Sequence, residues 1–130
     1  MQVAQSNNNS KKRSVLFVDD EEMVLEVGSL MLRKLGYKAI SVNNGDKAIE
    51  ILKENKVAFV ILDMLMPGMN GFEIYHKLKK IQPKVKIILT SGYIWDQTKE
   101  RSASIGFDSF IQKPFSMKQL SEKIENIKNW

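Results

Sequence analysis

The sequence predicts an α/β protein in which helices cover both faces of a parallel sheet. Short apolar runs alternate with amphipathic segments five times along the chain, and the connections between them are short. The run at residues 57–62 is apolar at every position, which is typical of a strand buried on both faces. Alternation of this kind implies right-handed crossovers within one doubly wound sheet.

The composition is that of an ordinary globular domain. The chain has 130 residues, of which 43% are hydrophobic and 27% charged, so one domain with one core is expected. The absence of cysteine excludes disulfides and thiolate metal sites, and it fits a cytoplasmic location. Residues 1–13 are polar, and we predict a flexible tail or linker there, followed by a folded domain over 14–130.

The first half of the chain predicts two strands and two helices. Strands are expected at 14–18 and 38–42, with a helix over 21–35 between them. Acidic residues at the start of that helix favour its dipole, and Gly36 is suited to end it. Its inward face is predicted to carry Val24, Val27, Leu30, Met31 and Leu35. A second helix follows the turn at 44–46, with its inward residues at Ala48, Ile51 and Leu52.

The second half repeats the alternation. Strands are predicted at 57–62, 85–89 and 109–111. A helix follows the loop at 67–71, a short one is expected over 97–104, and the last helix carries Met117, Leu120, Ile124 and Ile127 on one face.

Polar residues stand at the carboxyl ends of four predicted strands: Asp19, Asp20, Asp63, Thr90 and Lys113. Taken singly, each has a structural explanation, such as a helix cap, a turn or a surface charge. In a parallel sheet, however, these ends share one edge, and ligands bind there. Three carboxylates, a hydroxyl and an ammonium at one edge predict a pocket for a divalent cation and a phosphoryl group.

Four motifs at these positions resemble the receiver domains of two-component response regulators. They are VLFVDDE at 15–21, ILDMLMPGMNG at 61–71, LTSGY at 89–93 and FIQKPF at 110–115. The resemblance covers residues 14–130. It implies a CheY-like, flavodoxin-like (βα)5 sandwich with a parallel sheet of order 2-1-3-4-5.

The resemblance also implies roles for individual residues. Asp63 matches the phosphoacceptor. Asp20 matches a direct Mg²⁺ ligand, and Asp19 matches a residue that reaches the metal directly or through water. The backbone carbonyl of Leu65 matches a further ligand beside Asp63, and Mn²⁺ is a possible substitute for Mg²⁺.

Further matches concern the phosphoryl group and the response to it. Thr90 and Lys113 match the hydroxyl and the ammonium that contact the phosphoryl oxygens. Thr90 and Phe110 match the switch pair that remodels the face formed by the short helix expected over 97–104, the strand predicted at 109–111 and the last helix. The bond between Lys113 and Pro114 matches a cis peptide bond of the family.

The function so implied is a phosphoacceptor domain of a phosphorelay, rather than an enzyme that acts on other molecules. The expected donor is a histidine kinase or a histidine phosphotransfer protein, and the response would pass to a downstream protein or a covalently linked domain. The sequence leaves open whether the chain is a stand-alone receiver or part of a larger protein, such as a hybrid histidine kinase. No membrane partner is expected.

Two other classes of protein share some of these features. A Mg²⁺-dependent phosphatase of the haloacid dehalogenase type also uses an aspartate nucleophile, but it needs an acid two residues later, where this chain has Leu65. The net charge of +5 suggests nucleic-acid binding. The lysines are spread along the sequence, however, which is typical of solvated helix faces and disfavours such a partner.

Overall fold

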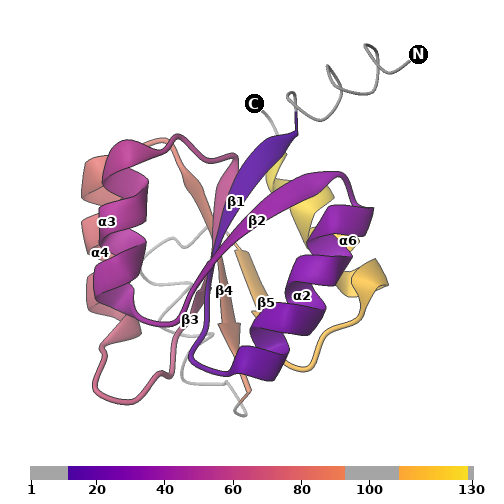
Figure 1. The fold of residues 1–130 in the computed structure, drawn as a ribbon, viewed down its shortest axis with the longest axis horizontal. Coiled ribbons are helices and arrows are strands. Elements are labelled where there is room, and N and C mark those ends of the chain that lie inside the picture. The colour runs from indigo at the N-terminus through magenta and orange to yellow at the C-terminus, as the bar shows by residue number, and fades with distance from the viewer. Residues whose placement is uncertain (1–11, 93–108, 129–130) are drawn as a thin grey trace.

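The computed structural model describes residues 12–92 and 109–128. Five parallel strands form one sheet in the order β2-β1-β3-β4-β5 (Figure 1). The strands are β1 (Arg13–Val18), β2 (Tyr37–Val42), β3 (Phe59–Asp63), β4 (Lys86–Ser91) and β5 (Ser109–Gln112). The predicted fold class and strand order are therefore confirmed. Most of the predicted tail and the whole predicted helix at 97–104 lie outside the described residues.

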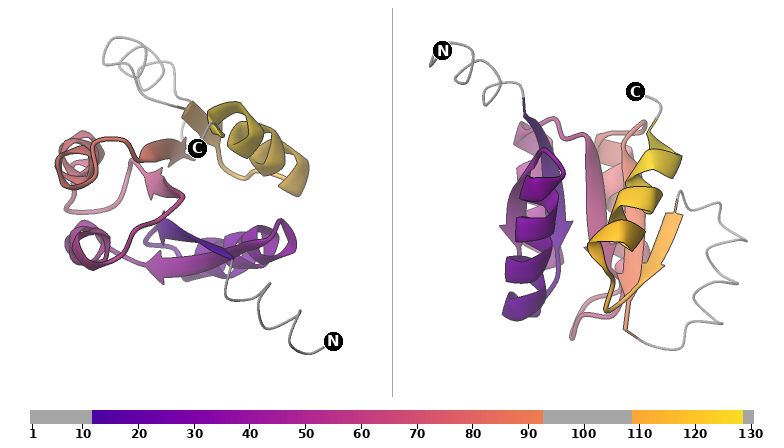
Figure 2. Two further views of the ribbon diagram at one scale, coloured as in Figure 1. Left: turned by 90° about the horizontal axis from the view of Figure 1, so that it is seen from above. Right: turned by 90° about the vertical axis from the view of Figure 1, so that its right-hand side faces the viewer.

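Four helices of the described part of the chain cover the sheet. Helices α2 (Glu22–Lys34) and α6 (Met117–Ile127) lie on one face, and α3 (Gly45–Glu54) and α4 (Gly71–Ile81) lie on the other (Figure 2). Side chains of β1 alternate between the two layers, so that Val15 and Phe17 join the α2/α6 core whereas Leu16 and Val18 join the α3/α4 core.

The inward face predicted for α2 is wrong at two positions. Val27 and Leu30 are 48% and 54% exposed, and the buried residues of this helix are Gly28 and Leu32. Helix α2 lies so close to the sheet that a Cβ on Gly28 would be 2.3 Å from Cε2 of Phe17. Gly28 therefore determines which face of α2 packs against the sheet, and Val27 and Leu30 remain on the surface.

Side chains cap three of the helices where they begin, at the carboxyl edge of the sheet. Asn44 accepts a hydrogen bond from the backbone N–H of Lys47, and Asn70 accepts from those of Phe72 and Glu73. Ser116 starts α6 with a capping box. These caps fix the loops that surround the carboxyl edge.

Candidate functional site

The strand register brings the predicted site residues to one edge. Asp63 is the register partner of Thr90 on β4, and the N–H of Met64 continues that pairing by donating to the carbonyl of Thr90 at 2.9 Å. Beyond β5, the N–H of Lys113 donates to the carbonyl of Ser91 at 2.9 Å. Asp19 directly follows β1, which pairs with β3. Backbone pairing alone therefore places these groups side by side.

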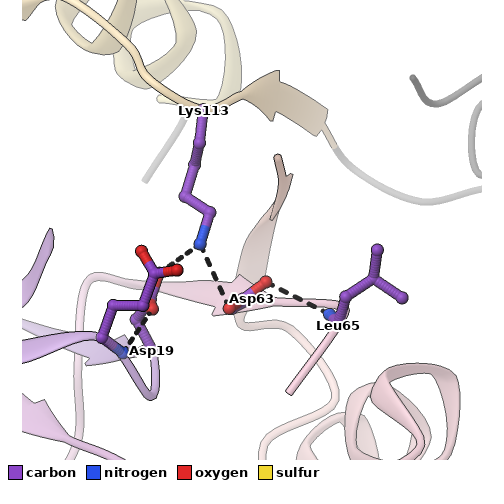
Figure 3. A network of polar contacts seen from close by, with 5 residues as sticks. Asp19, Asp63, Leu65 and Lys113 are labelled. Carbon is purple, nitrogen blue, oxygen red and sulfur yellow. Dashed lines mark hydrogen bonds and ion pairs between the residues drawn. The ribbon is translucent and has the colours of Figure 1, made fainter. Parts of the chain in front are cut away.

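Lys113 connects two of the carboxylates. Its Nζ lies 3.0 Å from Oδ2 of Asp19 and 3.2 Å from Oδ2 of Asp63, and Figure 3 shows its side chain reaching toward both. The other oxygens are also hydrogen-bonded. Oδ1 of Asp63 accepts from the N–H of Leu65 at 3.1 Å, and Oδ1 of Asp19 accepts from the N–H of Glu21 at 2.9 Å. Both aspartates are thereby held in fixed orientations.

Burial shapes the electrostatics of this pair. Burial raises the pKa of Asp63 above its ordinary value, and the charge of Asp19 adds to the effect. The N–H of Leu65 and the ammonium of Lys113 oppose this rise without cancelling it. Burial alone would lower the pKa of Lys113, but its hydrogen bond to Asp19 and the charge of Asp63 outweigh burial and raise it. Lys113 is therefore a cation at neutral pH.

The carboxylates fit a divalent cation. Oxygen atoms of Asp19, Asp20 and Asp63 all lie within 4.8 Å of one another. Asp19 and Asp63 are buried whereas Asp20 is exposed, so the cluster opens to solvent on the side of Asp20. Among the described residues, one ammonium, that of Lys113, pairs with the two buried carboxylates of this cluster, which leaves an excess of negative charge. Hard oxygen ligands suit Mg²⁺. The donor set therefore fits the metal that the sequence predicts.

The hydroxyl of Thr90 is buried without a partner. Among the residues that the structure describes, its Oγ1 is the one buried side-chain polar atom that makes no hydrogen bond. Such a group normally costs free energy unless it has a use. Because Thr90 is aligned with Asp63, a group attached to Asp63 could satisfy this hydroxyl.

Two other predicted features are visible. The peptide bond between Lys113 and Pro114 is cis. Phe110 is half-buried and packs against the α3/α4 core, and it is the register partner of Leu89. Phe110 thus lies one position before the strand residue aligned with Thr90, which is Ile111.

A pocket of about 730 Å³ adjoins the site. Asp20, Asp63 and Lys113 lie at its polar end, and an apolar wall is formed by residues that include Met23, Val27, Leu65 and Phe115. Sequence reasoning missed Met23 and Phe115 as part of the site. The signal was available, because Met23 and Val27 are four residues apart on the helix that follows Asp20.

Comparison with known proteins decides the family. The sequence profile described as "Response regulator receiver domain" matches residues 15–125. The chain belongs to this family. Membership disfavours the alternative of a phosphatase of the haloacid dehalogenase type.

Relatives of this receiver domain include much longer signalling proteins. It is 30% identical over 118 residues to the autoinducer 1 sensor kinase/phosphatase LuxN of Vibrio campbellii, covering 91% of this chain and 14% of LuxN. It is 32% identical over 127 residues to the sensor kinase CckA of Brucella abortus, covering 96% of this chain and 13% of CckA. The chain thus spans a small part of these relatives.

A solved structure agrees with the fold. The CheY-like response regulator receiver domain protein of Methanospirillum hungatei superposes with a TM-score of 0.81 and 26% identity, covering 88% of this chain and 92% of that one. None of the helices described for this receiver domain has the length and apolar character needed to span a membrane.

Proposed function

We propose that this receiver domain accepts a phosphoryl group on Asp63 from a phosphohistidine donor. The observation that carries the proposal is the position of the Lys113 ammonium, 3.2 Å from Oδ2 of a buried Asp63 whose neighbours are two further aspartates. Ordinary buried aspartates are neutralised by one partner, whereas this one lies in a cluster with an excess of negative charge.

In the proposed step, an oxygen of Asp63 attacks phosphorus. The new bond joins that oxygen to phosphorus, the bond between phosphorus and the donor imidazole nitrogen breaks, and the nitrogen leaves with the electron pair and takes up a proton. Lys113 would stabilise the negative charge on the phosphoryl oxygens. The N–H of Leu65, which donates to Oδ1 of Asp63, orients the attacking carboxylate.

Asp19, Asp20 and Asp63 would hold Mg²⁺, with the backbone carbonyl of Leu65 as a further ligand. When bound, the metal supplies positive charge that offsets repulsion between the carboxylates and the incoming phosphoryl group. Asp20 is the exposed member of the cluster, so its replacement by Asn is expected to weaken Mg²⁺ binding, measured by calorimetric titration, roughly tenfold or more. Asp46→Asn, an exposed change at the start of α3, is the control.

The apolar wall of the pocket supports a protein donor. Met23, Val27 and Leu65 are 73%, 48% and 48% exposed, and all three line the pocket that contains Asp63. Exposed apolar residues around a polar centre are typical of a surface that a partner covers. We propose that a histidine kinase or a histidine phosphotransfer protein covers them while its phosphohistidine enters the pocket.

The switch is proposed to run through Thr90. Its unpartnered hydroxyl would bond to the phosphoryl group on Asp63, and Phe110 would move as Thr90 is drawn in. Two states that differ by one hydrogen bond and the packing of one ring have a small free-energy gap, which phosphorylation is able to invert. The altered surface around β5 and α6 would then be read by a downstream protein or a linked domain.

Intact mass spectrometry tests the phosphoacceptor. After incubation with phosphoramidate and Mg²⁺, the wild-type chain is expected to gain the mass of one phosphoryl group, and treatment with base should remove it. Asp63→Asn should gain nothing, whereas the matched change Asp46→Asn, on an exposed aspartate, should behave as wild type. Equal labelling of wild type and Asp63→Asn would reject the proposal.

A further inference from the structure

The edge of the sheet opposite the phosphoryl site holds a second pocket. It is an open groove of about 860 Å³ at the amino ends of the strands, the upper end of Figure 1. The connections that lead into β3 and β4 form its walls, and the start of β1 lies beside them. We call it the amino-edge groove. A pocket of this volume is large enough for a ligand.

The amino-edge groove is strongly basic. In the part of the chain that the structure describes, its lining includes one acidic residue, Glu54, and five basic ones: Arg13, Lys53, Lys56, Lys84 and Lys86. These residues are scattered in the sequence, and the fold gathers them at one edge. Within residues 12–92 and 109–128, the structure gives no ion pair to any of the four lysines.

Helix dipoles do not account for this charge. Lysine in the last turn of a helix is favourable, and Lys53 is so placed in α3. Lys56 and Lys84, in contrast, lie in loops, and Arg13 and Lys86 are the first residues of strands. Like charges brought together repel one another, so an anionic ligand would relieve a cost that folding imposes.

Hydrogen bonds from two side chains, Gln82 and Lys79, hold the groove in shape. Nε2 of Gln82 donates to the carbonyl of Leu52 at 3.0 Å and to the carbonyl of Asn55 at 2.8 Å, and so joins the ends of α3 and α4. Nζ of Lys79 donates to the carbonyl of Val85 on the other side of the same loop. Because the groove is preformed, little conformational entropy is lost when a ligand binds.

The floor of the groove identifies the kind of anion. Its lining includes Ala58, Ile81 and Pro83, all of which are at least partly exposed, together with the more buried Val57 and Val85. An apolar floor under a basic rim suits a ligand that carries both carboxylates and an apolar side chain. Of the described residues that line the groove, none is aromatic, so this part of the chain provides no ring on which nucleic-acid bases could stack.

We propose that the amino-edge groove binds an extended acidic peptide segment that places an apolar side chain on the floor. Lys86 is aligned with Phe59 and, through it, with Val15, so Arg13 and Lys86 stand on the two sides of β3. Two strand spacings amount to roughly 10 Å across the sheet, and the offset of Arg13 by two residues from Val15 adds roughly 7 Å along the strand. The Cα atoms of Arg13 and Lys86 are therefore about 12 Å apart, which is about three to four residues of extended chain. Acidic residues a few positions apart on either side of one apolar residue would therefore match the rim and the floor.

Fluorescence anisotropy with a labelled peptide of alternating glutamate and leucine tests this site at physiological salt. The wild-type chain is expected to bind it, and replacing the leucines by glycine should weaken binding roughly tenfold or more, because the floor is no longer filled. Lys56→Glu combined with Lys84→Glu should weaken binding by a similar factor. The matched control, Lys47→Glu with Lys118→Glu, reverses two exposed lysines outside the groove and should stay within about twofold of wild type.

Three results would overturn the proposal. One is the absence of peptide binding, and another is an equal loss in the groove variant and the control variant. The third is tighter binding of single-stranded or duplex DNA than of the peptide, provided that the groove variant abolishes it. The assay needs no phosphodonor and no Mg²⁺, so a failure to bind the peptide would not contradict the proposed phosphoryl transfer to Asp63. Equally, a failure of Asp63 to accept a phosphoryl group would not contradict peptide binding at the amino-edge groove.

Discussion

Nζ of Lys113 lies 3.2 Å from Oδ2 of Asp63, although the two residues are 50 positions apart in the sequence. Asp63 is the last residue of β3, and Lys113 directly follows β5. The same ammonium is 3.0 Å from Asp19, so one cation is shared by two buried carboxylates. Removal of that cation would leave both carboxylates uncompensated. This relationship makes Lys113 important for stability as well as for the proposed chemistry.

We predict that Lys113→Met lowers the free energy of unfolding by about 3 kcal/mol in metal-free buffer at pH 7, because breaking a buried pair strands the remaining charges. Urea denaturation measures this. Lys128→Met is the matched control, since Lys128 pairs with Glu125 at 3.3 Å on an exposed surface and should contribute less than about 0.5 kcal/mol. Equal losses of unfolding free energy in the two variants would show that the ion pairs of Lys113 stabilise the protein no more than an exposed pair does.

Asp63→Asn is predicted to raise stability in metal-free buffer at neutral pH. Since the pKa of Asp63 is raised in the folded protein, the folded state holds its proton more tightly than the unfolded state, whose pKa is about 3.9. Wild type therefore loses stability as pH rises from the unfolded pKa through the folded pKa, and the loss persists above it. The gain in Asp63→Asn should vanish in acid below that window.

Denaturation of both proteins across this pH range with a chelator present measures the difference. Asp20→Asn serves as the control, because Asp20 is exposed and is not among the causes of the raised pKa of Asp63. A stability difference between wild type and Asp63→Asn that does not change with pH would contradict the prediction.

Thr90→Val is predicted to leave the unfolding free energy unchanged, or to raise it by up to about 1 kcal/mol, because the lost hydroxyl has no partner. The neighbouring Ser91 is equally buried but does have an interaction partner, so Ser91→Ala should be destabilising by about 1 kcal/mol. Thermal or urea denaturation of the two variants provides the comparison. A clear loss of stability in Thr90→Val would mean that its hydroxyl is satisfied in the resting protein.

Gly28→Ala is predicted to destabilise the domain by roughly 1 to 3 kcal/mol, although alanine is the better helix former. The reason is the 2.3 Å approach of the added Cβ to the ring of Phe17. Urea denaturation of Gly28→Ala, Phe17→Leu and the double variant should reveal a favourable coupling, since the smaller side chain makes room. If the effects of the two single changes simply add in the double variant, contact with Phe17 is not the reason that Gly28→Ala is destabilising. Leu30→Ala, on the exposed side of α2, controls for changes in helix propensity.

The sequence was sufficient for the fold and for the positions of the site residues, because both depend on strand order and on where each strand ends. It did not show which of Asp19 and Asp20 would be buried. Their difference arises in three dimensions, where the N–H of Asp19 pairs with the carbonyl of Val42 and its side chain meets Lys113, whereas Asp20 remains exposed.

The outward apolar residues of α2 were misjudged for a related reason. Periodicity shows that Val24, Val27 and Met31 share a helical stripe, but not what covers each part of it. The close contact between Gly28 and Phe17 turns Val27 toward the pocket. Likewise, the lysines of the amino-edge groove have no pattern in sequence, because loops from separate repeats bring them together.

The length of β3 separates the two ends of the molecule. Its five residues, Phe59–Asp63, extend over about 17 Å. Solution at physiological ionic strength screens exposed charges beyond about 8 Å. An anionic segment arriving at the amino edge would therefore barely alter the electrostatic potential at the exposed carboxylate of Asp20. The two ends can be occupied independently unless a shift of the intervening strands connects them.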